Sequence, residues 1–159
     1  MALTWKEFFL GLVEVWSQKS KCKHYHVGAI FVREKQVLQG GYNGPTAGDL
    51  HCDKVGCAKE VNGKILPPGS KLCRGGHAEM NSIVNAAKNG TSLSGCDLWC
   101  KYSPCWDCAK HLNNLKVKRV FYLIRYEPEF KRVKELFDRV GIKLIQIRVK
   151  NNKKGEKHG

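Results

Sequence analysis

Apolar residues near the start of the chain recur at the spacing of one face of an α-helix. The recurring positions are Trp5, Phe8, Phe9, Leu12, Val13 and Trp16. Thr4 stands just before them and Glu7 follows it by three residues, which is the pattern of a capping box at a helix N-terminus. We therefore predict an amphipathic helix over residues 5–16 whose aromatic side chains pack into a broad core.

Two short apolar runs after this helix indicate a β-hairpin. Residues 27–32 and 37–42 are rich in strand-forming side chains, and Glu34-Lys35 between them can turn the chain. Residues 43–76 then show no sustained periodicity and contain several glycines and prolines. A structureless segment of this length inside a compact domain needs something else to order it.

From residue 77 onward the pattern alternates regularly between helix and strand. The predicted helices are 78–88, 105–115 and 130–140, and the predicted strands are 97–101, 119–124 and 142–149. Asn89-Gly90 and Gly141 provide C-terminal stops for two of the helices. An opening hairpin followed by this alternation predicts an α/β fold, with three α/β/α layers around a central mixed sheet.

The length of 159 residues fits one domain, which we place at residues 1–149 and follow by a basic, fraying tail at 150–159. Lys and Arg outnumber Asp and Glu by 28 to 14, and the resulting formal charge of +14 favours anionic partners without choosing among them. No apolar run suits a membrane helix, and the N-terminus lacks the pattern of a secretory signal. We therefore expect a cytoplasmic protein without membrane contact. Its eight cysteines should be reduced, and those at metal spacing should serve as zinc ligands rather than form disulfides.

Two short motifs together contain the parts of a catalytic zinc site. The first motif is His77-Ala78-Glu79, and the second, further along the chain, is Pro104-Cys105-Trp106-Asp107-Cys108. Zinc prefers imidazole and thiolate ligands, and a catalytic site uses three protein ligands and leaves the fourth position to water. His77, Cys105 and Cys108 supply that number of ligands.

Each of these residues has a position that suits its role. Pro104 favours a helix start, where the positive end of the helix dipole lowers thiol pKa values, so we expect Cys105 and Cys108 both to bind zinc as thiolates with little cost. Glu79 is expected to take a proton from the attacking water and deliver it to the base as a general acid and base. The combination of H-x-E with P-C-x-x-C is typical of zinc-dependent nucleobase deaminases. Alone, the two cysteines would also fit a redox pair.

Several motifs give the chain a more specific resemblance. They are Gly41-Tyr42-Asn43-Gly44, His77-Ala78-Glu79-Met80-Asn81 and Ser103-Pro104-Cys105, with Cys108-Ala109-Lys110 following. In these residues the chain resembles the deoxycytidylate deaminases of bacterial or viral type, from about Trp5 to Tyr126. The resemblance implies the cytidine-deaminase-like fold, which agrees with the three layers predicted above.

The resemblance also assigns residues to the substrate. It places Asn43 on the nucleotide sugar, and we expect Ala78, Ser103 and Tyr126 to contact the substrate as well. A purely structural role for Asn43, in a left-handed turn, is the alternative. Possible phosphate contacts by chemistry alone are Arg33, Lys101, Arg125 and Tyr126. The histidines for which the sequence indicates no role are His24, His26, His111 and His158.

Members of this family often carry a second, structural zinc. The resemblance assigns this zinc to four cysteines, with His51 as a substitute ligand. The four are Cys22, Cys52, Cys57 and Cys73. Such a site would order the irregular segment, because four thiolates close a tetrahedron with no position left for water. Cys96 and Cys100 are expected to be buried as small apolar residues.

The function implied by the resemblance is hydrolysis of dCMP to dUMP with release of ammonia, which supplies thymidylate synthesis. It further implies activation by dCTP and inhibition by dTTP with Mg²⁺, and a homo-oligomer, commonly a hexamer. A polynucleotide deaminase acting on RNA or single-stranded DNA would use the same zinc chemistry, although the turn at Asn43 favours a mononucleotide. A zinc-stabilised binding module is the non-enzymatic alternative, and it would leave Glu79 without a purpose.

Overall fold

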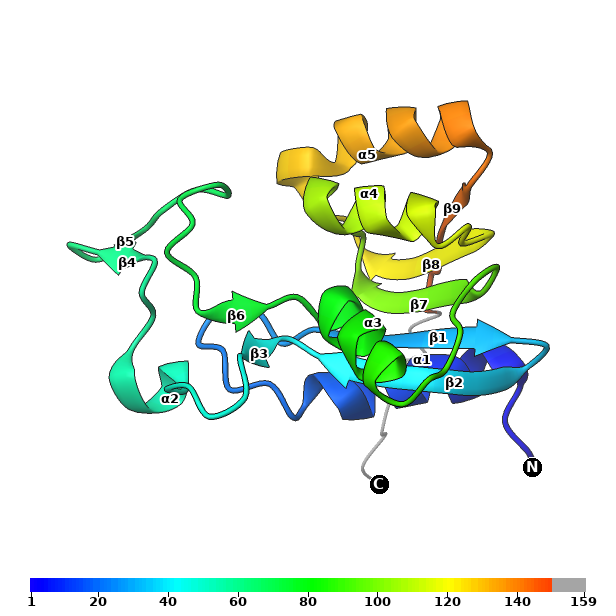
Figure 1. The fold of residues 1–159 in the computed structure, drawn as a ribbon, viewed down its shortest axis with the longest axis horizontal. Coiled ribbons are helices and arrows are strands. Elements are labelled where there is room, and N and C mark those ends of the chain that lie inside the picture. The colour runs from blue at the N-terminus through cyan, green and yellow to red at the C-terminus, as the bar shows by residue number, and fades with distance from the viewer. Residues whose placement is uncertain (150–159) are drawn as a thin grey trace, which may run out of the picture.

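The computed structural model describes residues 1–149, which form three layers around a five-stranded sheet (Figure 1). Its strands are β1 (Gly28–Arg33), β2 (Gln36–Tyr42), β7 (Asp97–Tyr102), β8 (Arg119–Ile124) and β9 (Lys143–Gln146). They lie in the order β2-β1-β7-β8-β9. β1 pairs antiparallel with both β2 and β7, whereas β7, β8 and β9 pair in parallel. The predicted mixed sheet is confirmed.

Helices cover both faces of the sheet. They are α1 (Trp5–Ser17), α3 (Ala78–Lys88), α4 (Trp106–Asn114) and α5 (Glu127–Val140). Alternate residues of β1 separate the two cores, because Ile30 and Val32 pack with α1 while Ala29 and Phe31 pack with the other three helices. Among residues 1–149, no helix combines the length and apolar character needed to cross a lipid bilayer.

The predicted capping box of α1 is present. The Thr4 hydroxyl accepts from the backbone N–H of Glu7 at 3.2 Å, and the Glu7 carboxylate accepts from the backbone N–H of Thr4 at 2.8 Å. The prediction that the aromatic residues of α1 are all core is wrong for Trp5 and Phe8, which are 50% and 40% exposed. Lys35 Nζ lies 5.5 Å from the Trp5 ring, so this end of α1 reaches the β1–β2 turn rather than the middle of the sheet.

Most predicted boundaries lie within one residue of those in the structure, and two differ by three residues. α5 begins at Glu127, three residues before the prediction, because Pro128 fits the first turn of a helix. β9 ends at Gln146 and not at residue 149. The predicted basic tail at 150–159 lies outside the described residues.

The irregular segment contains only short elements. These are β3 (Gly44–Pro45), α2 (Cys52–Val55), β4 (Glu60–Val61), β5 (Lys64–Ile65) and β6 (Gly75–Gly76). β3 pairs with β6 and so closes the segment at its base, while β4 and β5 form a small hairpin that projects away from the sheet (Figure 1).

Gly28 allows α1 to lie directly on β1, and Gly28→Ala is expected to destabilise the protein by about 2–3 kcal/mol. A Cβ atom at this position would lie 2.1 Å from the Val13 carbonyl oxygen and 2.7 Å from the Ser17 nitrogen, both backbone atoms of α1. Gly11→Ala is the matched control, because nothing lies within 4 Å of a Cβ atom there. Alanine favours a helix, so Gly11→Ala should raise the midpoint of urea denaturation while Gly28→Ala lowers it. Equal midpoints for the two variants would contradict this packing.

Candidate active site

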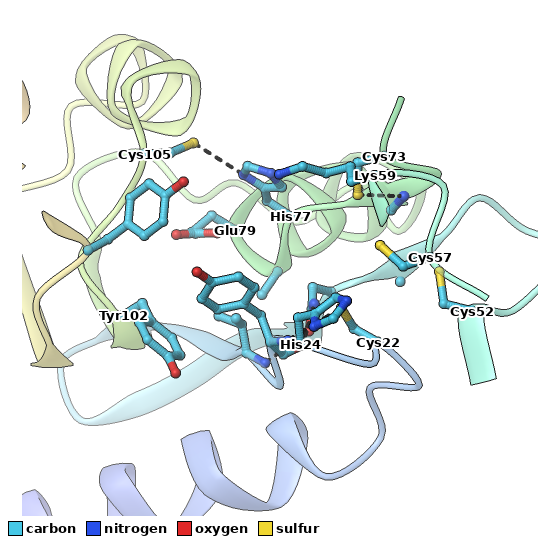
Figure 2. Close-up of a pocket in the computed structure, with 18 of the residues that line it drawn as sticks. Cys22, His24, Cys52, Cys57, Lys59, Cys73, His77, Glu79, Tyr102 and Cys105 are labelled. Carbon is cyan, nitrogen blue, oxygen red and sulfur yellow. Dashed lines mark hydrogen bonds between the residues drawn. The ribbon is translucent and has the colours of Figure 1, made fainter. Parts of the chain in front are cut away.

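A hollow opens where α3 and α4 begin, and it extends toward the irregular segment (Figure 2). His77, Glu79 and Cys105 line one part of it, and Cys22 and Cys57 line another. Side chains from segments far apart in the sequence therefore share one hollow.

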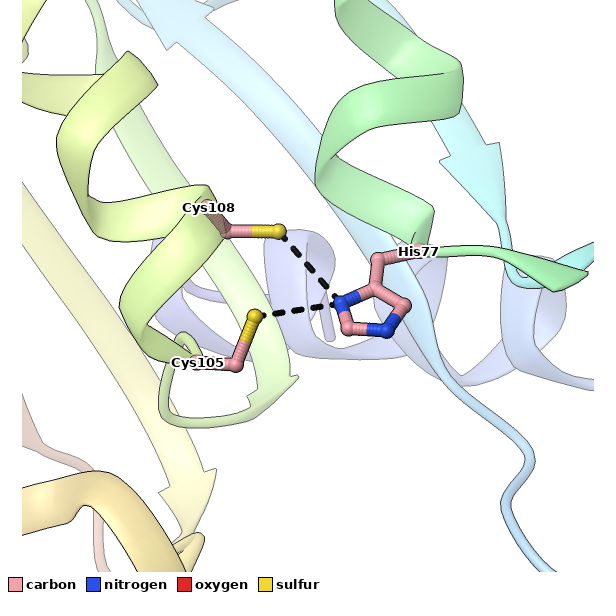
Figure 3. Close-up of side chains that lie close together, drawn as sticks. All are labelled: His77, Cys105 and Cys108. Atoms are coloured by element: carbon pink, nitrogen blue, oxygen red, sulfur yellow. Dashed lines mark hydrogen bonds between the residues drawn. The ribbon is translucent and has the colours of Figure 1, made fainter. Parts of the chain in front are cut away.

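The beginnings of two helices bring the three predicted zinc ligands together (Figure 3). His77 is the N-cap of α3 and Cys105 is the N-cap of α4, with Cys108 in the first turn of α4. The Glu129 carboxylate reaches from α5 and accepts from the Trp106 N–H at 3.0 Å, which fixes the start of α4. The N-termini of α3 and α4 therefore converge on one group of side chains.

Asn81 holds the approach to His77 in place. Its side-chain amide donates to the Tyr42 carbonyl at 2.9 Å and to the Gly76 carbonyl at 3.2 Å. These bonds connect α3 to the end of β2 and to the residue before His77, so the backbone that positions the histidine is held by hydrogen bonds.

The geometry of the three side chains fits a zinc ion. His77 Nδ1 lies 3.2 Å from Cys105 Sγ and 3.5 Å from Cys108 Sγ. A tetrahedral ion with Zn–N of about 2.1 Å and Zn–S of about 2.3 Å places these atoms about 3.6 Å apart. Within the described residues this is the one group of three or more His, Cys, Asp or Glu whose ligand atoms all lie within 4.8 Å of one another. His77 would bind through Nδ1.

Glu79 lies in the first turn of α3 and is only 5% exposed. Its Oε2 lies 3.7 Å from Cys108 Sγ, so the carboxylate is next to the three ligands without being one of them. Burial raises the pKa of Glu79, and the nearby His77 partly opposes this effect. A raised pKa makes the carboxylate a stronger base, which helps it to take up a proton before passing it on as a general acid and base must.

The two thiols differ in their protonation without a metal. Both can bind zinc as thiolates, as the sequence predicts, but Cys108 must lose a proton to do so. A hydrogen bond with Cys108, supported by His77, lowers the pKa of Cys105 to about 4. The pKa of Cys108 is raised well above its usual range by its hydrogen bond with Cys105 and by burial. Two adjacent buried thiolates would repel each other, so the pair retains one proton that a metal dication must displace.

All four predicted substrate residues line the hollow, namely Asn43, Ala78, Ser103 and Tyr126. Asn43 Oδ1 accepts from the Val27 N–H at 2.9 Å, and Asn43 Nδ2 donates to the Tyr25 carbonyl at 2.8 Å. Its backbone is not left-handed, so the turn-conformation alternative for this residue is wrong. Ser103 is buried and its hydroxyl accepts from the Tyr126 N–H at 2.8 Å.

Three tyrosines form one wall of the hollow. The Tyr25 ring lies edge-on to Tyr102 at 5.6 Å and to Tyr126 at 6.5 Å between ring centroids. Burial raises the pKa of Tyr126 to about 12, so its hydroxyl remains a hydrogen-bond donor at neutral pH. The sequence analysis assigned no role to Tyr25 or Tyr102, although Tyr102 directly precedes the Ser103-Pro104-Cys105 motif.

The four cysteines expected at a second zinc also line the hollow, near one another in Figure 2. Cys22 Sγ accepts from the Tyr25 N–H and Cys73 Sγ accepts from the Gly75 N–H, both at 3.4 Å. Burial raises the pKa of Cys52, and the nearby Cys22 and Cys57 raise it further. No three of the four sulfur atoms lie within 4.8 Å of one another, so they gather without forming a closed tetrahedron.

The structure confirms some of the remaining sequence predictions and contradicts others. Cys96 and Cys100 are fully buried, as predicted. Three possible phosphate contacts point elsewhere: Arg33 donates to the Ser92 and Ser94 carbonyls, Lys101 pairs with Glu14, and Arg125 pairs with Glu127. The substitute ligand His51 does not line the hollow, whereas His24 and Lys59, which the sequence left without a role, do line it.

The three-layer fold, the His-Cys-Cys group and the buried glutamate beside it define the class of zinc-dependent nucleobase and nucleotide deaminases. Residues 3–124 match the family described as "Cytidine and deoxycytidylate deaminase zinc-binding region". The chain belongs to this family.

Individual relatives agree with this assignment. The chain is 31% identical over 145 residues to ComE operon protein 2 of Bacillus subtilis, covering 91% of this chain and 72% of that protein. It is 30% identical over 123 residues to the deoxycytidylate deaminase of Mycobacterium phage D29, covering 74% of this chain and 93% of the phage protein.

Solved structures extend the comparison to the fold. The dCMP deaminase of cyanophage S-TIM5 in complex with dCMP and dUMP is similar with a TM-score of 0.75 and 30% identity, over 92% of this chain and 99% of that one. A tRNA:A34 deaminase matches with a TM-score of 0.60 and 16% identity, which shows the shared fold alone.

Proposed function

We propose that this protein hydrolyses dCMP to dUMP and ammonia, with residues 1–149 as the catalytic domain. The observation that carries the proposal is the His77, Cys105 and Cys108 group at zinc spacing, with the buried carboxylate of Glu79 beside it. The similarity to a dCMP deaminase in complex with dCMP and dUMP supports this choice of substrate.

The chemistry requires water as the nucleophile and a group that moves protons. Zinc held by His77, Cys105 and Cys108 would lower the pKa of a water molecule toward 7. Glu79 takes a proton from the attacking water and delivers it to ring nitrogen N3 of cytosine while the water oxygen bonds to C4. It then takes the proton of the new C4 hydroxyl and passes it to the leaving amine. The C4–N bond then breaks, so that dCMP and water give dUMP and ammonia.

The other residues of the hollow would position the nucleotide. Asn43 keeps one amide hydrogen and one lone pair beyond its two backbone bonds, which suffice for a sugar hydroxyl. The Ser103 and Tyr126 hydroxyls and the backbone of Ala78 are available to the base and sugar because all three residues line the hollow. The tyrosine wall would exclude bulk water around them.

The four clustered cysteines support a second, structural zinc, and we expect purified protein to contain two zinc ions per chain. Cys52→Ala should reduce the content to one, because three remaining thiolates bind zinc more weakly than four. Atomic absorption on protein of known concentration measures this number. Cys96→Ala is the control and should retain two, since Cys96 is buried away from the cluster. A content of one in the unaltered protein would contradict the second site.

The substrate test compares dCMP with dCTP, CMP and deoxycytidine by the loss of cytosine absorbance. The proposed function predicts the highest kcat/KM for dCMP. Turnover of an oligonucleotide containing unpaired cytosine, unaffected by excess dCMP, would favour the polynucleotide alternative that the +14 charge permits. Binding without any turnover would favour a zinc-stabilised module.

Regulation and assembly follow from the same resemblance. We propose activation by dCTP and inhibition by dTTP with Mg²⁺, and a hexameric assembly acting in the cytoplasm. The eight unpaired cysteines support a reducing compartment. Adding each triphosphate to the dCMP assay and measuring the mass by light scattering test these points.

A further inference from the structure

The active-site hollow contains few positive charges for a substrate that carries a phosphate. Among the described residues that line it, the basic side chains other than the zinc ligand His77 are Lys59 and His24. The basic residues that the sequence suggested as phosphate contacts, Arg33, Lys101 and Arg125, do not line the hollow. The choice of a phosphate contact therefore narrows to two side chains.

Lys59 has features that a surface lysine lacks. It is half-buried, and no carboxylate among residues 1–149 lies within 4.0 Å of its ammonium group. Lysines are almost never fully buried unless they are paired with an anion, and Lys59 is partly withdrawn from the solvent. An ammonium group held in a binding hollow without an internal partner is available for an anionic group of a ligand.

The backbone around Lys59 is fixed although the β4–β5 hairpin beyond it projects outward. The Lys59 carbonyl accepts from the Leu66 N–H at 2.8 Å, and the Cys57 carbonyl accepts from the Glu60 N–H at 3.0 Å. Lys59 thus stands at the base of the hairpin, between the cysteine cluster and the first hairpin residue. Its position does not depend on the hairpin tip.

His24 reaches the same hollow from the segment before β1 and is linked to this hairpin. Its Nε2 lies 3.5 Å from a Glu60 carboxylate oxygen, and Lys23 Nζ lies 4.0 Å from the same atom. The Glu60 carboxylate is therefore a nearby partner for His24, whereas no carboxylate among the described residues lies near the Lys59 ammonium group. Of the two basic side chains, Lys59 is the better phosphate contact.

The orientation of the substrate agrees with this position. The amine that leaves must lie beside Glu79 and the zinc ligands, and the 5′-phosphate is at the opposite end of the nucleotide. In Figure 2, the Lys59 side chain extends from beside Cys73 toward His77, on the side of His77 away from Cys105, and His24 lies with Cys22. Given the proposed dCMP activity, we propose that Lys59, assisted by His24, binds the 5′-phosphate and makes the enzyme select nucleotides over nucleosides.

The test compares Lys59→Gln with the unaltered protein on dCMP and on deoxycytidine. A charged hydrogen bond to phosphate is lost only with dCMP, so the preference for dCMP over deoxycytidine in kcat/KM should fall about 10- to 100-fold. The loss should be in KM and not in kcat, because the 5′-phosphate takes no part in the bond changes at C4. Where deoxycytidine turnover is too slow to measure, competitive inhibition by dUMP and by deoxyuridine gives the same comparison.

Two matched variants serve as controls. Lys54→Gln and Lys64→Gln remove exposed lysines from the same segment that do not line the hollow, and both should keep the preference for dCMP. Lys59→Arg should retain part of it, because the charge is kept. An unchanged preference in Lys59→Gln, or an equal loss with both substrates, would overturn the role of Lys59 while leaving dCMP deamination intact. Failure of the unaltered protein to deaminate dCMP would instead overturn the proposed function.

Discussion

Glu79→Gln is expected to lower kcat for dCMP by about 10³- to 10⁴-fold, toward the upper limit for loss of a general acid and base. Glutamine has nearly the shape of glutamate but cannot hold the transferred proton. The effect should be large because the same carboxylate serves both the attack of water and the departure of the amine. Steady-state rates of dCMP loss at saturating substrate measure it.

The zinc content should remain unchanged in this variant, because Glu79 lies beside the ligands without being one of them. Glu135→Gln on the exposed face of α5 is the matched control and should keep full activity. A Glu79→Gln protein with full zinc content and nearly normal turnover would contradict the proton-transfer role. Loss of zinc together with activity would show a structural role in its place.

Much of the fold could be predicted because its signals are local. The bounds of α3 and β8 agree with the periodicity residue by residue, and the capping box of α1 needs only Thr4 and Glu7. Trp5 and Phe8 show where a local signal fails. Helical spacing identifies the apolar face of α1, but how far the sheet extends beneath that face depends on strands that come later in the chain.

The residues of the candidate site likewise include some that the sequence indicates and others that only the folded structure reveals. The zinc ligands and Glu79 are carried by short motifs at helix beginnings, so spacing alone indicates them. Lys59 and His24 come from segments without periodicity, and only the folded chain brings them into the hollow. The four cysteines are an intermediate case, since their residue type is visible in the sequence but their mutual distances are not.

The affinity for zinc at the catalytic centre is expected to rise about 100-fold for each pH unit around neutrality, because binding displaces two protons. The hydrogen bond with Cys105 raises the pKa of His77 to about 9, and the pKa of Cys108 is raised further. Both groups are therefore protonated near pH 7 in the metal-free protein, whereas Cys105 is already a thiolate. The slope should decrease to about one proton above the pKa of His77.

Calorimetry of zinc binding in buffers of different ionisation enthalpy counts these protons. In the His77→Ala variant, the protons released on zinc binding come from elsewhere in the chain. Subtracting their number from that of the unaltered protein gives the number of protons released at the catalytic centre. In Cys108→Ser that difference should shrink by one proton, with a large loss of zinc affinity and of dCMP turnover, because a serine hydroxyl does not replace a thiolate ligand. A difference near zero at pH 7 would mean that both sulfurs and the imidazole are already deprotonated, contrary to the hydrogen bonds that join them in the metal-free centre.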